Sequence, residues 1–112
     1  TILCPESESA SCSVNCQNEY SCYETAIQAP HSLDLACTGP GSCLDNDVLC
    51  PPDSCAITCS ADDCCTGMTV YANSTTSLSI DCEYASIADP SYIYGSCNSM
   101  NIYAQNASSV TF

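Results

Sequence analysis

Hydrophobic residues and cysteines alternate with small polar residues in four short stretches of this chain. The stretches cover residues 12–16, 33–37, 55–59 and 78–82, and their starts lie 21, 22 and 23 residues apart. Alternation with a period of two predicts β-strands that bury one face. A repeat of this length is typical of solenoids, in which each coil buries its apolar face against its neighbours.

Each repeat contains two further segments. A polar segment follows the alternating stretch and ends in Ser-Cys or Cys-Cys, at Cys22, Cys43, Cys65 and Cys97. A short aliphatic segment begins five residues later, at Ile27, Val48, Val70 and Ile102. No stretch keeps the apolar spacing of a helix. The sequence therefore predicts an all-β, disulfide-rich, three-sided parallel β-solenoid of four to five coils, about 21–23 residues each, forming one domain over residues 1–112.

The last repeat differs from the others in length. From the end of the first segment to the cysteine of the second segment, the spacing is six residues in three repeats, but 15 residues from Cys82 to Cys97. We interpret the difference as a corner insertion of about nine residues within 83–95. Solenoids tolerate such insertions because only the entropy of a surface loop changes.

Thirteen cysteines in 112 residues indicate a disulfide framework and an oxidising, extracellular location. Stacked cysteines of adjacent coils, such as Cys16 and Cys37, and cysteines facing each other within one coil, such as Cys16 and Cys22, both fit disulfide geometry. The sequence does not choose between the two patterns. The number is odd, and Cys4 and Cys64 are the candidates for the cysteine left over. The disulfide candidates are Cys4, Cys12, Cys16, Cys22, Cys37, Cys43, Cys50, Cys55, Cys59, Cys64, Cys65, Cys82 and Cys97.

The repeated order of Ser-Cys, aliphatic residue and Cys-x-Val/Ile-x-Cys resembles that of cysteine-rich extracellular β-solenoid proteins. The resemblance covers nearly the whole chain and concerns architecture. The insertion within 83–95 departs from the pattern, and so does the loss of the first cysteine of the run in alternate coils, where Leu33 and Leu78 stand.

The chain has no Lys or Arg and a net charge of −13. Nucleic acid and anionic membranes are therefore poor partners, because nothing neutralises their phosphates. No apolar run approaches the length of a membrane span, so membrane insertion is not expected. Two sequons, at Asn73 and Asn106, predict N-linked glycans on a secreted protein.

The two ends of the chain match different parts of the repeat. The segment from Ile2 to Cys4 matches a third segment, and the segment from Val110 to Phe112 matches a first segment. Neither end shows the polar cap that soluble monomeric solenoids need. We therefore expect a structural subunit of a glycosylated extracellular filament, a homopolymer built end to end, with Ile2, Cys4, Val110 and Phe112 at the contact.

The alternative function is a monomeric extracellular binding module for carbohydrate, calcium or ice. Tyr71 and Tyr103 occupy equivalent outward positions that suit sugar stacking. Calcium, the one cofactor considered, would use the acidic corners, whose carboxylates belong to Asp45, Asp47, Asp62 and Asp63. Ice binding requires a ladder of outward threonines, and the outward positions here are mixed.

Catalysis and a thiolate metal cluster are not expected. The cysteines alternate with Val, Ile and Leu, and Cys-x2-Cys ligand pairs are missing. A Ser/His/Asp arrangement would have to use the lone His31, and paired carboxylates such as Asp45 and Asp47 have no cleft indicated around them.

Overall fold

The computed structural model describes residues 2–4, 11–61, 63–82, 97, 100–105 and 107–111. Within these residues the regular secondary structure consists of β-strands, and no helix occurs. The bounds of the strands are β1 Ile2–Leu3, β2 Ser11–Cys16, β3 Ala26–Gln28, β4 Ser32–Cys37, β5 Asp47–Leu49, β6 Ser54–Cys59, β7 Thr69–Tyr71, β8 Ser77–Cys82, β9 Asn101–Tyr103 and β10 Ser109–Thr111.

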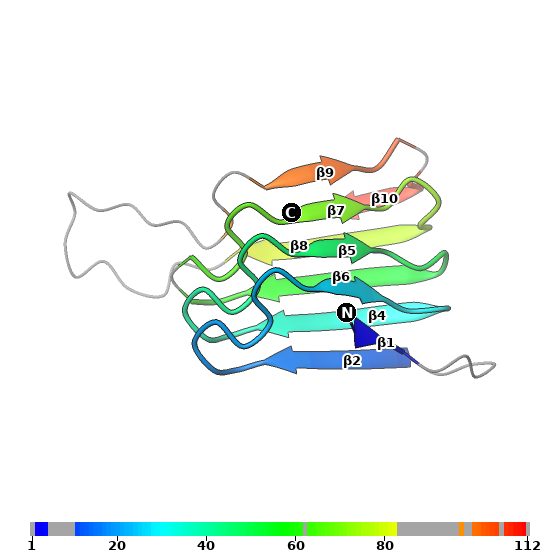
Figure 1. Ribbon diagram of the computed structural model, residues 1–112. Coiled ribbons are helices and arrows are strands. Elements are labelled where there is room, and N and C mark those ends of the chain that lie inside the picture. The colour runs from blue at the N-terminus through cyan, green and yellow to red at the C-terminus, as the bar shows by residue number, and fades with distance from the viewer. Residues whose placement is uncertain are drawn as a thin grey trace.

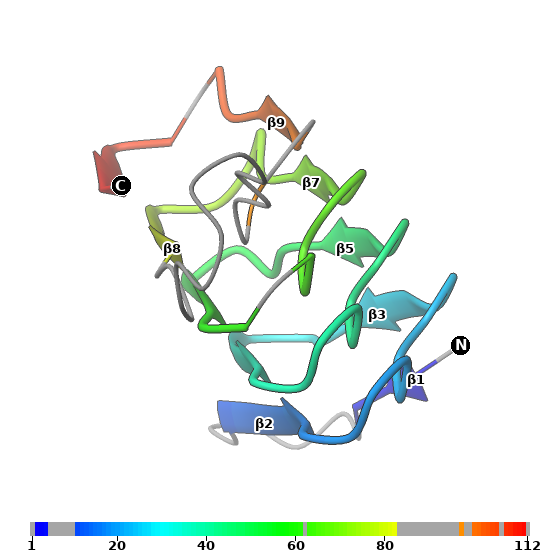
Figure 2. The same cartoon turned by 90° about the vertical axis from the view of Figure 1, so that its left-hand side faces the viewer.

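The strands form two parallel sheets of a β-solenoid. The short strands lie in the order β1-β3-β5-β7-β9, and the longer ones in the order β10-β8-β6-β4-β2. The chain thus alternates between the two sheets, and each coil of the solenoid adds one strand to each sheet (Figure 1). Successive coils stack on one another, from β1 and β2 at one end of the solenoid to β9 and β10 at the other (Figure 2).

The third side of the solenoid consists of stacked turns rather than strands. These turns occupy residues 18–24, 39–45 and 61–67, with residue 62 outside the description. Backbone hydrogen bonds join them: Cys22 N–H donates to the Ser42 carbonyl at 2.7 Å, and Cys43 N–H donates to the Cys64 carbonyl at 2.6 Å. A side made of turns therefore still satisfies its backbone through the neighbouring coil.

Three coils are complete in the described residues, fewer than the four to five expected. They run from β2, β4 and β6 through a turn to β3, β5 and β7. The predicted insertion within 83–95 lies outside the described residues, as does most of the third side of the following coil. Beyond it, β9 and β10 each add a strand to one sheet.

The register of both sheets places like residues in inward columns. Ile2, Ile27, Val48, Val70 and Ile102 are successive partners in the first sheet. Val14, Leu35, Ile57 and Ile80 are successive partners in the second. Because residues two apart share a face, the cysteines at the strand ends point into the same core. The predicted columns are confirmed.

Two further columns on the turn side adopt positive φ. One contains Tyr20, Gly41 and Asp63, and the other contains Glu24, Asp45 and Gly67, with φ between 49° and 72°. Each position is glycine in one coil only, so the other coils place a side chain in a region that disfavours it. The hydrogen bonds between stacked turns hold these residues there.

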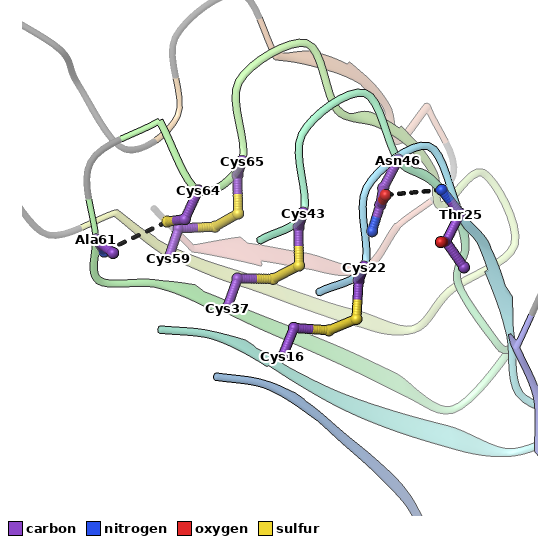
Figure 3. The surroundings of a disulfide bond; sticks show 10 residues. All are labelled: Cys16, Cys22, Thr25, Cys37, Cys43, Asn46, Cys59, Ala61, Cys64 and Cys65. Atoms are coloured by element: carbon purple, nitrogen blue, oxygen red, sulfur yellow. Dashed lines mark hydrogen bonds between the residues drawn. A yellow bond between two sulfur atoms is a disulfide. The ribbon is translucent and has the colours of Figure 1, made fainter. Parts of the chain in front are cut away.

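Six disulfides join cysteines that are 5 to 15 residues apart along the chain, and none joins stacked cysteines of adjacent strands. Four connect the end of a strand of the second sheet to the turn side, with Cα–Cα distances of 5.9–6.1 Å: Cys16–Cys22, Cys37–Cys43, Cys59–Cys65 and Cys82–Cys97. Figure 3 shows three of them stacked as parallel bridges. Stacked cysteines have parallel Cβ directions, whereas residues on facing sides point toward each other, as a disulfide requires.

The Cys82–Cys97 bond also bears on the predicted insertion. It occupies the same place in the coil as the other three bonds, yet its sequence separation is 15 rather than 6. The nine additional residues therefore fall between two cysteines whose positions in the coil are conserved from repeat to repeat.

The remaining two disulfides explain the missing cysteines of alternate coils. Cys4–Cys12 and Cys50–Cys55 cross the corner between the two sheets. At the equivalent corners the pairs are Ala29 with Leu33, Ala72 with Leu78, and Ala104 with Val110. A small residue opposite a large aliphatic one thus fills the space that two bonded cysteines fill elsewhere.

Candidate functional site

The two ends of the solenoid expose columns that are buried in its middle. Leu33, Cys55 and Leu78 are 0–2% exposed, whereas Val110, their partner on the last strand, is 39% exposed. At the other end, Cys12 and Val14 are half-buried although their partners Leu33 and Leu35 are buried. The exposure follows position in the stack and not residue type.

Open strand edges accompany these exposed columns. Sheet order ends at β1 and β2 on one side and at β9 and β10 on the other. Each edge strand offers its outer N–H and C=O groups to a further strand. Within the described residues, both ends therefore combine an incomplete core with unpaired ladder groups.

The columns at the two ends are of the same kind. Placing β1 of one copy on β9 of another sets Ile2 on Ile102 in the inward column and Leu3 on Tyr103 in the outward one. Placing β2 on β10 sets Cys12 on Val110. These contacts resemble pairings inside the stack, where Ile2 pairs with Ile27, Leu49 with Tyr71, and Cys12 with Leu33.

The structure places three of the four predicted contact residues at these ends. Ile2 is half-buried on β1, Cys4 follows β1, and Val110 lies on β10. Phe112 lies outside the described residues. Cys4 is bonded to Cys12, so the prediction of Cys4 as a candidate for the odd cysteine is wrong.

Cys64 is the one cysteine outside the six disulfides. It occupies the column of Ser21 and Ser42 on the turn side, and it is fully buried. Its sulfur accepts a hydrogen bond from the Ala61 N–H at 3.4 Å (Figure 3). A burial of this kind makes Cys64 a core residue of the third coil rather than a surface thiol.

Asn46 is a polar residue that lies between the second turn and β5. It is fully buried, and its Oδ1 accepts a hydrogen bond from the Thr25 N–H at 2.9 Å (Figure 3). Its carbonyl accepts a hydrogen bond from the Thr69 N–H at 2.9 Å. Asn46 therefore connects the first, second and third coils.

The outward faces of the two sheets differ sharply. The first sheet carries a column of large side chains, namely Leu3, Gln28, Leu49, Tyr71 and Tyr103. The second carries an unbroken column of five serines, which are Ser11, Ser32, Ser54, Ser77 and Ser109. This serine column was not predicted, although one serine precedes each inward first-segment position in the sequence. The neighbouring outward columns contain different residue types, as predicted; one of them consists of Ser13, Asp34, Ala56 and Ser79.

The Tyr71 and Tyr103 side chains form a stacked pair. Their ring centroids are 5.6 Å apart and their planes differ by 13°. Both side chains remain about half exposed, at 46% and 50%. Two residues after Tyr71, the sequon residue Asn73 is exposed in the turn that follows β7, whereas Asn106 lies outside the described residues.

The acidic candidates for calcium do not form a cluster in the described part of the chain. Asp45 is exposed on the turn side, and Asp47 begins β5 on the first sheet. Asp63 accepts a hydrogen bond from the Thr66 hydroxyl at 3.2 Å, and Asp62 lies outside the described residues. No carboxylate there joins two other ligand groups within 4.8 Å.

Two groups of cysteine sulfurs do lie that close together, formed by Cys16, Cys37 and Cys43, and by Cys37, Cys59 and Cys65. All five residues are disulfide-bonded, so their sulfurs are not thiolates that could bind a metal.

A shallow hollow beside β1 is lined by Leu3, Cys4, Gln28, Ala29 and Pro30. This lining contains no general acid or base. None of the described segments is a helix with the length and hydropathy needed to cross a membrane.

Comparisons with protein-family models, with curated proteins and with solved structures find no match for this chain.

Proposed function

We propose that this chain is a structural subunit, or one segment, of a glycosylated extracellular filament whose solenoid units stack end to end. The observation that carries the proposal is the contrast within one column, where Leu78 is fully buried and Val110, one strand further, is 39% exposed. A second unit placed on this end would bury the column and pair the open strand edge.

The stacking is head to tail, because the β1 and β2 end meets the β9 and β10 end. Such heterologous contacts do not close and therefore produce fibres. Five strands per sheet, spaced about 4.8 Å apart, give an axial repeat of about 24 Å.

The disulfide content supports an extracellular location. Six disulfides in a chain of 112 residues are typical of proteins that fold in an oxidising compartment. We propose N-linked glycans at Asn73 and Asn106, no enzymatic activity and no required cofactor. A monomeric carbohydrate-binding module is the second candidate, favoured by the exposed Tyr71–Tyr103 pair.

The test is controlled assembly. The chain is secreted with a removable folded domain fused before Thr1, so that the β1 end is obstructed. Cleavage of this domain should convert monomers into threads with the 24 Å repeat, followed by light scattering and negative-stain microscopy. A control with the same domain released but Val110→Asp should remain monomeric. Dispersed monomers of the cleaved natural sequence at high concentration would overturn the proposal and favour the binding module.

Ionic strength provides an additional check. Each unit carries a net charge of −13, so stacking brings like charges together. The screening length falls from about 30 Å at 0.01 M salt to about 8 Å at 0.15 M. Threads should therefore grow faster as salt is raised, as measured by the initial rate of light scattering.

A further inference from the structure

The sequon at Asn73 lies in a defined turn at the end of β7. The Thr75 N–H donates a hydrogen bond to the Ala72 carbonyl at 3.2 Å, so Asn73 and Ser74 occupy the two central positions of the turn. Both are exposed, whereas Thr75 is fully buried and its hydroxyl donates to the Pro51 carbonyl at 2.8 Å. The asparagine therefore points away from the core on a fixed backbone.

A hydrogen bond orients the Asn73 amide. Its Oδ1 accepts from the Gln105 N–H of the next coil at 3.0 Å. A backbone N–H only donates, so the oxygen has to face Gln105 and Nδ2 occupies the other position of the amide. A sugar on Nδ2 leaves this hydrogen bond intact, since Oδ1 remains an acceptor.

The same bond sets the direction of an attached sugar. A substituted amide is planar and prefers the trans form, in which the group on nitrogen lies on the side of the oxygen. The first sugar on Asn73 would therefore extend toward the coil that carries Tyr103 and Gln105.

Two tyrosines lie close in the sequence to Asn73 and to its hydrogen-bond partner Gln105. Tyr71 precedes Asn73 by two residues, so their Cα atoms are at most about 7 Å apart, and Tyr103 precedes Gln105 by two. The two rings stack at 5.6 Å and are about half exposed. Tyrosine rings present an apolar body to which the C–H groups of a pyranose can pack.

We propose that the first N-acetylglucosamine of a glycan on Asn73 packs against the Tyr71–Tyr103 pair and fixes the glycan to the outer face of the first sheet. The inference rests on the glycan of the proposed function but not on filament assembly. It also gives the tyrosine pair an occupant attached to the chain itself.

The modification forms one bond and breaks one. Nδ2 of Asn73 bonds to the anomeric carbon of a lipid pyrophosphate-linked oligosaccharide, the lipid pyrophosphate leaves, and one amide proton is lost to a base of the transferase. Because Thr75 is buried in the folded chain, its hydroxyl is accessible for sequon recognition only before the coil closes. The protein for the test is therefore produced in a glycosylating secretory host.

The test couples the sugar to the tyrosines. In an Asn106→Gln background, the Asn73 glycan is trimmed enzymatically to one N-acetylglucosamine and compared with Asn73→Gln. The single sugar should raise the melting temperature by about 2–5 °C. With Tyr71→Leu and Tyr103→Leu this increase should vanish. Leucine is tolerated in this outward column, since Leu3 and Leu49 occupy it.

A matched control is Tyr23→Leu, which removes a tyrosine of similar exposure, 44%, from the turn side. It should leave the increase unchanged. In the trimmed protein, the N-acetyl methyl resonance should be displaced by ring currents, and the displacement should disappear in the double leucine variant.

The outcomes separate the two proposals. An occupied Asn73 whose sugar stabilises the natural and double leucine proteins equally would overturn the packing inference alone. An unmodified Asn73, by mass spectrometry of the secreted protein, would overturn both the inference and the glycoprotein part of the proposed function. Coupling between sugar and tyrosines in a protein that never forms threads would support the inference and contradict the filament.

Discussion

Leu78 and Val110 are register partners on adjacent strands of one sheet, yet only the first belongs to the core. Leu78 has a strand on each side and is fully buried, whereas Val110 has one neighbouring strand and is 39% exposed. The first-coil residues Cys12 and Val14 repeat the contrast at the other end. In a parallel solenoid, burial of a side chain is therefore supplied by the next coil and not by the coil that contains it.

The largest expected difference comes from placing a charge in this column. Leu78→Asp buries a carboxylate without a partner and should destabilise the chain by about 4 kcal/mol or more. Val110→Asp leaves its carboxylate in water, so the unfolding free energy should change by less than about 1 kcal/mol. Thermal unfolding followed by circular dichroism measures both. Equal destabilisation would show that the end is covered like the middle.

The corner disulfides provide a second comparison. The double substitution Cys50→Ala with Cys55→Ala removes a disulfide and the packing of the buried Cys55 sulfur. It should lower the free energy of unfolding by about 3–4 kcal/mol. Cys4→Ala with Cys12→Ala removes the equivalent bond at the half-buried end and should cost about 2 kcal/mol. Denaturant unfolding is the measurement.

The corner rule itself can be tested in the same position. Cys50→Ala with Cys55→Leu copies the pair Ala72 and Leu78, so it should recover about 1–2 kcal/mol relative to the double alanine variant. If leucine at position 55 gives no recovery, the alternation of cysteine pairs with Ala and Leu pairs is not a matter of filled volume.

Smaller effects are expected where the turns adopt positive φ. Gly67 in the third coil has φ 72°, and a Cβ there would meet the Asp45 side chain, so Gly67→Ala should lower stability by about 1 kcal/mol or more. Glu24 in the first coil has φ 49°, so Glu24→Gly should leave stability unchanged or raise it by up to about 1 kcal/mol. Opposite signs in a chemical-denaturation series support the stacked-turn geometry, and equal losses contradict it.

The smallest effect concerns a titration on the same turn. A hydrogen bond to the Glu24 carboxylate, together with the charges of Glu24 and Asp45, raises the pKa of Tyr23 above 10.0. The associated stability is present below pH 10 and is lost as pH rises through the folded-state pKa. Glu24→Gln should lower the pKa of Tyr23, as measured by absorbance of tyrosinate. An unchanged titration would place Glu24 away from the hydroxyl.

Particular residues show how far the sequence could predict this fold. The period of the repeat aligned Ile27, Val48, Val70 and Ile102 correctly, because in-register parallel pairing demands like residues at like positions. The choice between Cys16–Cys37 and Cys16–Cys22 could not be made, since both distances suit a disulfide and only side-chain direction separates them. The positive φ of Tyr20 and Glu24 carried a signal only through Gly41 and Gly67, their equivalents in other coils.

The candidate site divides in the same way. The sequons, the acidic corners and the unmatched ends were visible in the chain. The stacking of Tyr71 on Tyr103, the hydrogen bond from Gln105 to Asn73 and the dispersal of Asp45, Asp47 and Asp63 were not, because each depends on the direction of a side chain at a corner.

By itself, the sequence determined the period, the inward columns and the two-residue alternation, because these follow from local spacing and from the pleat of a strand. The tertiary structure decided which cysteines bond, which side is built of turns, and which members of a column are core. These properties depend on what lies across the coil or above it, and such neighbours are 5 to 15 residues away for a disulfide and more than 20 for a stacked strand.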